Sequence, residues 1–250
     1  MKLNGKQYDK FILNGKTYDK FYLNNKIYQS LDPGLILDLP LQNNFTDYSA
    51  SGISMVAGGT SNQPIFALSG RKAGEYCAVF NGSQSIKTTT NLPINSDKVT
   101  IAFWMKTTQT TAGAIVELSP SWFSSGVNAF ATIINVTANK LYMGEQTTNT
   151  VRNVRDSSSN INDNSWKRIA IVFDRAKGTP DKISIYINGS LAGITSTTTG
   201  STTGNFVNNI IFIGQRGGST LGYTGSLMYL EILNYPITAS EALADYNSFL

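Results

Sequence analysis

The chain has 250 residues, of which only 14% are charged, against about 25% in an average soluble protein. Low charge combined with 22 glycines and many Ser, Thr and Asn residues is typical of an all-β protein with polar turns. It argues against a helical bundle, whose outer faces need Glu, Lys and Arg. Histidine is absent, which excludes a Ser-His-Asp relay and a His-ligated zinc site. The single Cys77 excludes an internal disulfide and a cysteine-cluster metal site.

The sequence shows neither a targeting signal nor a membrane-spanning segment. No basic-then-apolar leader opens the chain, and no apolar run reaches about 18 residues. We therefore expect a protein made in a cytoplasm, without a signal peptide and without membrane insertion. A role outside the cell then requires another vehicle, such as a particle that carries the protein there.

The first thirty residues contain a repeat with a period of ten. The copies begin at Leu3, Leu13 and Leu23 and read LNGKQYDKF, LNGKTYDKF and, in decayed form, LNNKIY. Asn-Gly between apolar residues favours a type I′ hairpin turn, because that turn needs positive φ at both central positions. The spacing predicts a small β-meander with Phe11 on one face and Tyr18 on the other. A sheet this small buries little by itself, so we expect a partner to cover it.

The whole net charge lies in this repeat. Residues 1–30 contain six Lys and two Asp, 6 − 2 = +4, so the remaining residues hold 14 basic and 14 acidic groups and are neutral. We predict docking onto an acidic protein surface; the alternative is a solvated Lys-rich edge that prevents aggregation. Nucleic-acid binding is not expected, because the lysines alternate with Asp and no Arg cluster occurs. The predicted attachment residues are Lys6, Tyr8, Phe11, Lys16, Tyr18, Phe21 and Lys26.

After a turn or linker at 30–34, about twelve short strands follow, joined by Gly, Asn and Thr connectors. This pattern predicts an all-β sandwich or jelly roll over 32–250, as a domain separate from residues 1–31. Asn188-Gly189 marks another hairpin, and TASE at 238–241 is a capping box that opens a C-terminal helix. The predicted strands are 35–39, 65–68, 76–80, 98–106, 114–118, 129–135, 140–144, 166–174, 182–188, 191–196, 206–214 and 226–233.

Several segments of this domain match a known pattern. They are VTIAFW at 99–104, WKRIAIVFD at 166–174, IYINGSL at 185–191, IG at 213–214, YTGSL at 223–227 and LNYPITASE at 233–241. In these segments residues 35–250 resemble a laminin-G-like, concanavalin A-like lectin jelly roll. The resemblance implies a concanavalin A-like β-sandwich with a short C-terminal helix. The family often has an Asp shortly after the late Gly, where this chain has Leu227-Met228, so no polar or metal role is carried over to that position.

In the family that the domain resembles, the enzymes are chiefly glycoside hydrolases. These need two carboxylates about 5–9 Å apart, on either side of the bond that is cut. On a strand, residues two or four apart share a face, so a catalytic pair should appear as closely spaced acids. The chain has no such pair, and we predict no enzymatic activity. The glutamates that stand alone are Glu75, Glu117, Glu145, Glu231 and Glu241.

A bound calcium ion is a further prediction. The stretch at 43–52 is rich in Asn and Asp and resembles the family's first loop, where a cation is sometimes held. Asp47 is the candidate ligand, with Asp156 and Asp163 as further candidates, because Ca²⁺ prefers several oxygen ligands. The alternative is that Asn and Asp only form turns here.

Carbohydrate binding needs an exposed aromatic face together with hydrogen-bonding side chains. Trp122 and Phe123 lie in a Ser/Gly-rich, loop-like stretch and are predicted to form a sugar platform. The alternatives for this pair are a subunit contact and a loop anchor tucked into the core. Arg216 and Tyr223, in the Gly-rich stretch 215–223, are predicted to form a second rim of the site.

Three other residues are predicted to be structural. Trp104 and Trp166 lie inside strand patterns, which indicates core positions rather than sugar contacts. Cys77 is flanked by strand residues and is predicted to be a buried side chain rather than a nucleophile.

The N-terminal repeat resembles the short LNGKxY repeats that open many phage tail and capsid accessory proteins. That resemblance implies a phage virion accessory protein, such as a head fibre, decoration or tail protein. Its lectin-like domain would face host-surface glycans, and its partners would be other virion proteins and further copies of itself, with a trimer suggested by fibre-like relatives. The alternatives are a stand-alone carbohydrate-binding lectin and a purely structural capsid or tail subunit that binds no glycan.

Overall fold

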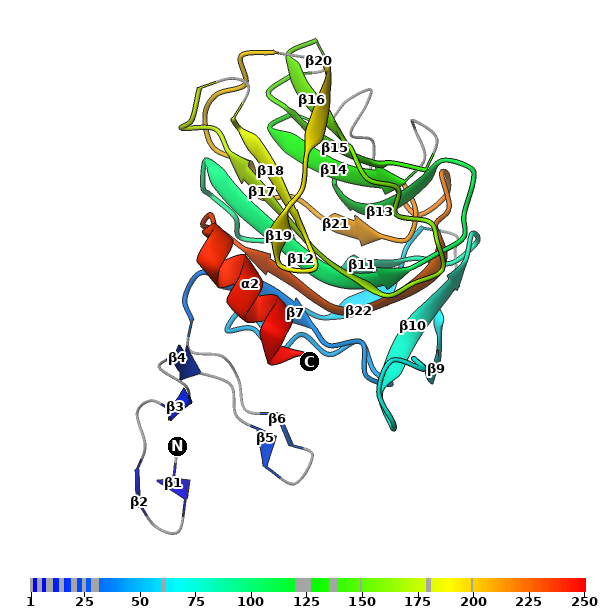
Figure 1. Cartoon of the computed structure of the whole chain (residues 1–250), viewed down its shortest axis with the longest axis vertical. Coiled ribbons are helices and arrows are strands. Elements are labelled where there is room, and N and C mark those ends of the chain that lie inside the picture. The colour runs from blue at the N-terminus through cyan, green and yellow to red at the C-terminus, as the bar shows by residue number, and fades with distance from the viewer. Residues whose placement is uncertain are drawn as a thin grey trace.

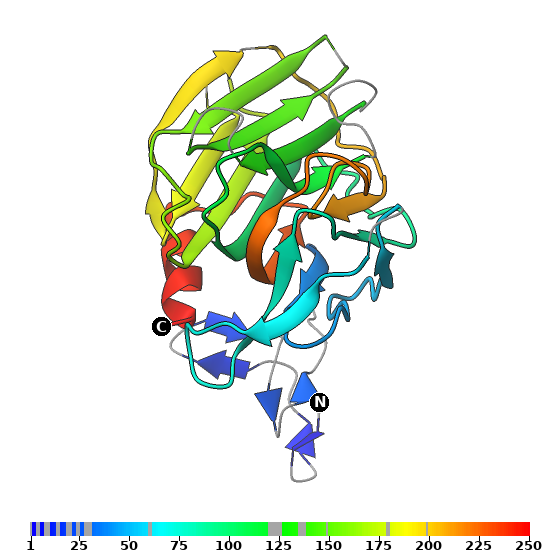
Figure 2. The same ribbon diagram turned by 90° about the vertical axis from the view of Figure 1, so that its right-hand side faces the viewer.

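The structure is a computed structural model that describes residues 32–250 except 60–61, 120–126, 135–138, 149, 179–180 and 199, together with six short strands between residues 2 and 27. Residues 32–250 form two antiparallel sheets packed face to face, with one helix, α2 (Ala239–Ser248), on the outer side of one sheet (Figure 1 and Figure 2). This arrangement confirms the predicted all-β sandwich with a C-terminal helix. In this described part of the chain, no helix is long and apolar enough to span a membrane.

The first sheet has eight strands, with β12 and β22 near its centre. In spatial order they are β19 (Ser190–Leu191), β18 (Ile183–Ile187), β17 (Lys167–Asp174), β12 (Lys98–Lys106), β22 (Thr224–Leu233), β10 (Tyr76–Asn81) and β9 (Ile65–Leu68), and β7 (Leu35–Leu39) also pairs with β22.

The second sheet also has eight strands and covers the inner face of the first. In spatial order they are β20 (Ile194–Thr198), β16 (Arg152–Ser157), β15 (Leu141–Gln146), β14 (Ala129–Ile134), β13 (Gly113–Leu118), β21 (Ile211–Ile213), β11 (Ile86–Thr88) and β8 (Met55–Ala57).

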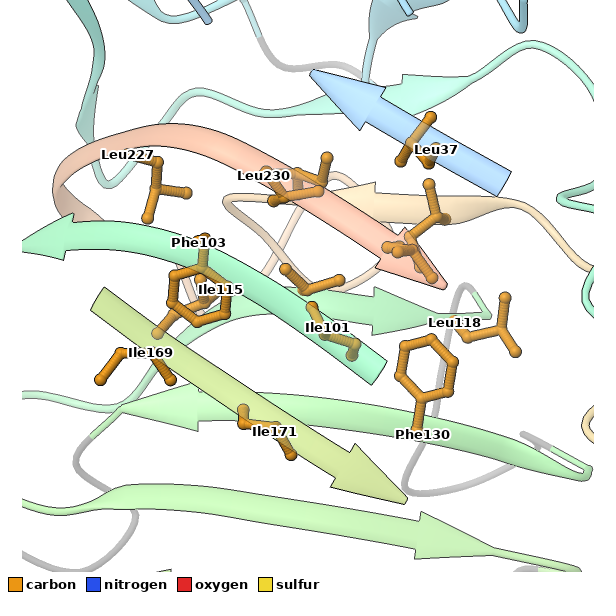
Figure 3. Close-up of a cluster of buried hydrophobic side chains, with 14 of the residues drawn as sticks. Leu37, Ile101, Phe103, Ile115, Leu118, Phe130, Ile169, Ile171, Leu227 and Leu230 are labelled. Carbon is orange, nitrogen blue, oxygen red and sulfur yellow. The ribbon is translucent and has the colours of Figure 1, made fainter. Parts of the chain in front are cut away.

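The hydrophobic core lies between the two sheets. Alternate residues of β12, such as Ile101 and Phe103, point into it and meet Leu118 and Phe130 from the second sheet (Figure 3). Phe130 stacks on Phe173 of β17 with a centroid distance of 5.6 Å. Each fully buried side chain of this size contributes about 1.5–3 kcal/mol, so this layer is the main source of stability.

The outer face of the first sheet is also buried, because α2 packs on it. Trp104, on the face of β12 opposite to Phe103, is 3% exposed and contacts the rings of Tyr246 and Phe249 at 5.8 and 6.0 Å. The predicted capping box starts the helix: the Thr238 hydroxyl accepts from the backbone N–H of Glu241, whose carboxylate accepts from the backbone N–H of Thr238. The predictions that Trp104 and Cys77 are buried are therefore confirmed.

A buried arginine ties the helix to the sheet. Arg168 of β17 is 1% exposed and donates to Asp245 of α2 at 2.7 Å and to Glu231 of β22 at 2.9 Å. Its guanidinium also donates to the carbonyl of Tyr229 and lies over the Phe249 ring at 4.9 Å. Burial alone would lower the pKa of Arg168, but the two carboxylates raise it above its ordinary value.

Several strand predictions needed correction. Three strands were not predicted: β8, β11 and the polar strand β16. The segment predicted as one strand at 191–196 instead divides between β19 in the first sheet and β20 in the second, because the chain crosses between the sheets at Gly193. Of the strand predicted at 206–214, only β21 is regular.

The repeat forms three separate hairpins rather than one meander. β1 (Lys2–Leu3) pairs with β2 (Lys6–Gln7), β3 (Phe11–Leu13) with β4 (Lys16–Tyr18), and β5 (Tyr22–Leu23) with β6 (Lys26–Ile27), each pair as its own sheet. The strands on both sides of each predicted Asn-Gly or Asn-Asn turn do pair, as expected. The register pairs Phe11 with Tyr18, two residues that the prediction had set on opposite faces.

We predict that the Arg168→Met substitution lowers the free energy of unfolding by about 3 kcal/mol, since it leaves two partly buried carboxylates without their cation. Chemical denaturation followed by Trp fluorescence measures this change. The matched control is Lys98→Met, whose ion pair with Asp97 is long, at 3.7 Å, and about one third exposed, so a change within about 0.5 kcal/mol is expected. Equal stabilities of the two variants would contradict a helix clamp at Arg168.

Candidate functional site

A pocket of about 320 Å³ opens at the loop that follows β7. We call it the first-loop pocket. Pockets that hold small ligands usually start near this volume and combine apolar walls with a few polar groups. Its lining residues are Phe45, Thr46, Asp47, Gly52, Ile53, Ser54 and Met55.

Asp47 shapes this pocket from within the protein. One carboxylate oxygen accepts from the backbone N–H groups of Asp38 and Ser49, both at 2.9 Å. The other accepts from the Ser49 hydroxyl at 3.0 Å and from the backbone N–H of Ile53 at 2.8 Å. Hydrogen bonds to a charged acceptor are the stronger kind, so Asp47 fixes the loop against β7 and sets the pocket's shape in advance.

The walls of the pocket combine an aromatic ring with hydroxyl groups. Phe45 is half-buried and packs on Phe66 of β9, with ring centroids 4.7 Å apart. Thr46 and Ser54 are exposed at the opening. An apolar ring beside solvent-facing hydroxyls offers the two kinds of contact that a sugar ring makes.

The predicted calcium ligand, Asp47, lines this same pocket. Both Asp47 oxygens already accept hydrogen bonds from the protein, and Ca²⁺ takes six to eight oxygen ligands. Among the residues that the structure describes, no group of three or more acidic, His or Cys side chains gathers anywhere. The other two candidates also have protein partners: Asp163 pairs with Lys167 at 2.7 Å, and Asp156 lies buried on β16.

Arg216, predicted for a sugar-binding rim, lies against the outer face of the second sheet. Its guanidinium donates to Glu117 of β13 at 3.0 Å, and Glu117 is fully buried. The backbone N–H of Arg216 donates to the carbonyl of Thr220, which closes a short loop over this face. Arg216 is therefore held in place by an ion pair rather than projecting into solvent.

Tyr142 of β15 shares this outer face with a cluster of small apolar residues. It packs with Ala131, Ile133 and Val154, and it is 7% exposed. Burial raises its pKa to about 12, with nearby Arg152 acting in the opposite direction, so the phenol stays protonated at neutral pH. These residues of the outer face are screened from solvent, whereas the first-loop pocket is open to it.

Other predicted site residues lie elsewhere. Tyr223 is fully buried in the core beside Phe80, so it is placed inside the sandwich and not on a rim. Trp122 and Phe123 lie outside the described residues, as do the side chains of the predicted attachment residues in the repeat. Trp166 is half-buried and its indole N–H donates to the carbonyl of Ser69.

The sequence did not identify Ile53, Ser54 and Met55 as pocket residues. Met55 belongs to β8, a strand of three residues that was not predicted, and Ser54 directly precedes it. Phe45 and Thr46 were part of the stretch singled out as a cation loop, and their neighbour Asp47 gave the one usable signal. The Glu117–Arg216 pair spans 99 positions and leaves no local pattern.

A protein-family model described as the concanavalin A-like lectin/glucanases superfamily matches residues 80–242, more than half of the chain. No curated protein sequence matches the chain. Among solved structures, the binding domain of botulinum neurotoxin DC is 15% identical, with a TM-score of 0.62 over 87% of this chain and 52% of its own. The binding domain of Paraclostridial mosquitocidal protein 1 is 16% identical, with a TM-score of 0.64 over 86% of this chain and 52% of its own.

These structural relatives share the fold at low identity, and the chain spans about half the length of each. The family match covers the strands from the end of β10 onward and the first turn of the C-terminal helix, which include most of the strands of the sandwich. The chain therefore belongs to the concanavalin A-like lectin/glucanase superfamily.

Proposed function

We propose that this chain is a glycan-binding module whose sugar site is the first-loop pocket. The observation that carries the proposal is the pocket itself, an accessible hollow that the internal hydrogen bonds of Asp47 hold in shape. The solved relatives support a glycan as ligand. One structure shows the binding domain of botulinum neurotoxin DC in complex with SialylT, and another reports interaction of botulinum neurotoxin type C with two ganglioside molecules.

A sugar ring in this pocket would place its C–H surface against Phe45 and Met55. Its hydroxyl groups would reach the side chains of Thr46 and Ser54 at the opening. Both carboxylate oxygens of Asp47 already accept hydrogen bonds from protein groups. The carboxylate therefore does not serve as a charged contact for the ligand. The chemistry therefore favours a neutral part of a glycan over a phosphate or a carboxylate.

Binding rather than hydrolysis is the activity that the buried carboxylates support. Glu117 and Glu145, both fully buried, form ion pairs with Arg216 and Arg175 at 3.0 and 2.7 Å. A glycosidase needs one carboxyl group that can donate a proton and a second that faces the sugar. Both carboxylates are held in ion pairs, and neither lines the first-loop pocket.

The N-terminal hairpins are proposed to attach this module to a larger assembly, as in a phage virion accessory protein. Supporting this idea are the threefold repeat and the fact that residues 1–30 carry the entire net charge of +4. Proteomic analysis of purified particles tests the virion role directly. Absence of the chain from particles made in cells that express it would leave the stand-alone lectin as the better description.

We predict that the Ser54→Trp substitution, which fills the pocket, weakens glycan binding at least about tenfold, equivalent to about 1.4 kcal/mol. A glycan array with the full chain identifies the ligand, and calorimetry then measures its affinity. The control is Ser201→Trp, an exposed position next to β20 at the opposite edge of the second sheet, where no change is expected.

Trp122→Ala tests the rival location for the same activity. If it abolishes binding while Ser54→Trp does not, the sugar site lies at the loop predicted from the sequence and the pocket assignment is wrong. If the folded chain binds no glycan on an array that represents bacterial and animal surfaces, the purely structural role takes its place.

We predict that the Asp47→Asn substitution lowers the free energy of unfolding by about 1–3 kcal/mol, because an amide replaces the acceptor of four hydrogen bonds. Thermal melting with added calcium and with a chelator measures both this effect and any metal dependence. The expected loss is the same under both conditions. A calcium-dependent rise in melting temperature that the Asn variant abolishes would instead support the predicted metal site.

A further inference from the structure

Two apolar side chains, Tyr76 and Leu68, are exposed on the strand pair of β9 and β10, at the lower right of Figure 1. Among the side chains that the structure describes, Tyr76 of β10 is the most exposed aromatic, at 36%. Leu68 of β9, its cross-strand neighbour, is 64% exposed. Neither residue lines the first-loop pocket, so the pocket alone does not account for their exposure.

The strand register places this pair next to the aromatic wall of the pocket. Phe45, the ring that lines the pocket, packs on Phe66 of β9 with ring centroids 4.7 Å apart. Leu68 follows Phe66 by two positions, so its side chain lies on the same face of the sheet, and Tyr76 lies opposite Leu68. Two strand residues span about 6.8 Å, a distance comparable to the spacing of neighbouring rings in a sugar chain.

A chain of hydrogen bonds joins Tyr76 to the rim of the pocket. The side-chain amide of Gln42 donates to the backbone carbonyl of Tyr76 at 2.6 Å and accepts from its backbone N–H at 2.9 Å. The side-chain amide of Asn44 donates to the backbone carbonyl of Gln42 at 3.2 Å, and its oxygen accepts from the backbone N–H of Thr46 at 2.9 Å. Because Thr46 lines the pocket, Tyr76 and the pocket are held in a fixed relation in the free protein.

The chemistry of this extension matches that of the pocket. The residues that form or support it are all uncharged: Gln42, Asn44, Thr46, Leu68 and Tyr76. Glu75, which precedes Tyr76 in the chain, is buried and paired with Arg71. A tyrosine ring offers an apolar face and a hydroxyl group at its edge, which are the two kinds of contact that a sugar makes. The extension therefore suits the same neutral class of ligand as the pocket.

We infer, resting on the proposed glycan site, that Tyr76 forms a second sugar contact and that the site takes a chain of two or more neutral sugars. One sugar would occupy the first-loop pocket against Phe45, and the next would lie on the ring of Tyr76 with Leu68 beside it. The pocket would then bind a single sugar, and Tyr76 would supply the preference for a chain. Because both contacts are fixed before the ligand arrives, ordering them costs little conformational entropy.

The test compares ligands of increasing length on the full chain. The probe is a printed array of neutral glycans, from single sugars to tetrasaccharides, and calorimetry then measures the affinity of the best ligand of each length. For the wild type, affinity should rise at least about tenfold from a single sugar to a longer chain. Tyr76→Ala should remove this rise and leave the affinity for single sugars unchanged, because only the second contact is lost. Tyr76→Phe, which keeps the ring, should retain most of the rise.

The matched control is Leu191→Ala, which removes an equally exposed apolar side chain, at 66%, from β19 at the opposite end of the same sheet. Binding should not change in this variant, and thermal melting shows that each variant is folded. A loss in Leu191→Ala equal to that in Tyr76→Ala would overturn the inference. So would a wild type that binds single sugars as tightly as longer chains, or a Tyr76→Ala variant that weakens both equally.

Ser54→Trp separates this inference from the proposed function, because filling the pocket should weaken ligands of every length. If Ser54→Trp weakens binding and Tyr76→Ala does not, the pocket remains the sugar site and the second contact is wrong. If Tyr76→Ala weakens binding and Ser54→Trp does not, the pocket is no part of the site, and the two-contact arrangement is wrong as well. If the folded wild type binds no glycan of any length, both proposals are overturned.

Discussion

Burial of both faces of the first sheet is the constraint on which the rest of the molecule depends. Ile101 and Phe103 on the inner face of β12 meet the second sheet, while Trp104 on its outer face lies under α2. A one-residue shift of β12 would exchange the side chains that pack on the second sheet with those that pack under α2, and the two sets differ in shape, so the register is fixed. Arg168 completes the outer layer, since it joins β17, β22 and α2 through hydrogen bonds that only this alignment provides. Because the two sheets and the helix stabilise the fold, the loops and edge strands can vary and can form binding surfaces.

A strand of this fold can be predicted from the sequence when its own residues carry the pattern. It cannot be predicted when contacts with residues distant in the sequence stabilise it. β18 alternates apolar and polar residues, β12 contains an apolar run with Trp104, and β17 contains an apolar run that follows Trp166, so local patterns identify them. The capping box at Thr238 is equally local, because its two hydrogen bonds link residues three apart. β16 shows the limit. Its sequence, Arg-Asn-Val-Arg-Asp-Ser, resembles a solvated loop, yet five of its six residues are buried.

The physical reason is a polar cluster that residues distant in the sequence assemble inside the sandwich. Glu145 and Arg175 are both fully buried and pair at 2.7 Å. Thr202 donates to Glu145 at 2.7 Å, and Asn153 of β16 also donates to it, at 3.4 Å. Burial lowers the pKa of Arg175, whereas Glu145 raises it, so the pair persists only because each charge compensates the other. A pattern of hydrophobic periodicity cannot detect a strand whose inward residues are polar and satisfied by each other.

The candidate site shows the same division between local and distant information. The sequence of the loop after β7 pointed to Asp47, because Asn and Asp cluster there, but it gave no sign of the hydrogen bonds by which Asp47 holds the loop. Those bonds come from the backbone N–H groups of Asp38, Ser49 and Ile53, which converge on the carboxylate only after the loop has folded. Tyr223 was misplaced for a related reason. Gly-rich surroundings predict a loop, and the ring nevertheless turns inward to pack beside Phe80.

The first-loop pocket is supported by the sandwich as well as by its own loop. Phe45, which lines the pocket, packs on Phe66 of β9 with ring centroids 4.7 Å apart. Asp47, which also lines it, accepts hydrogen bonds from the backbone N–H groups of Asp38 in β7 and of Ser49 and Ile53 in the loop. Walls that are already fixed in the free protein lose little conformational entropy when a ligand binds, so more of the contact energy contributes to affinity.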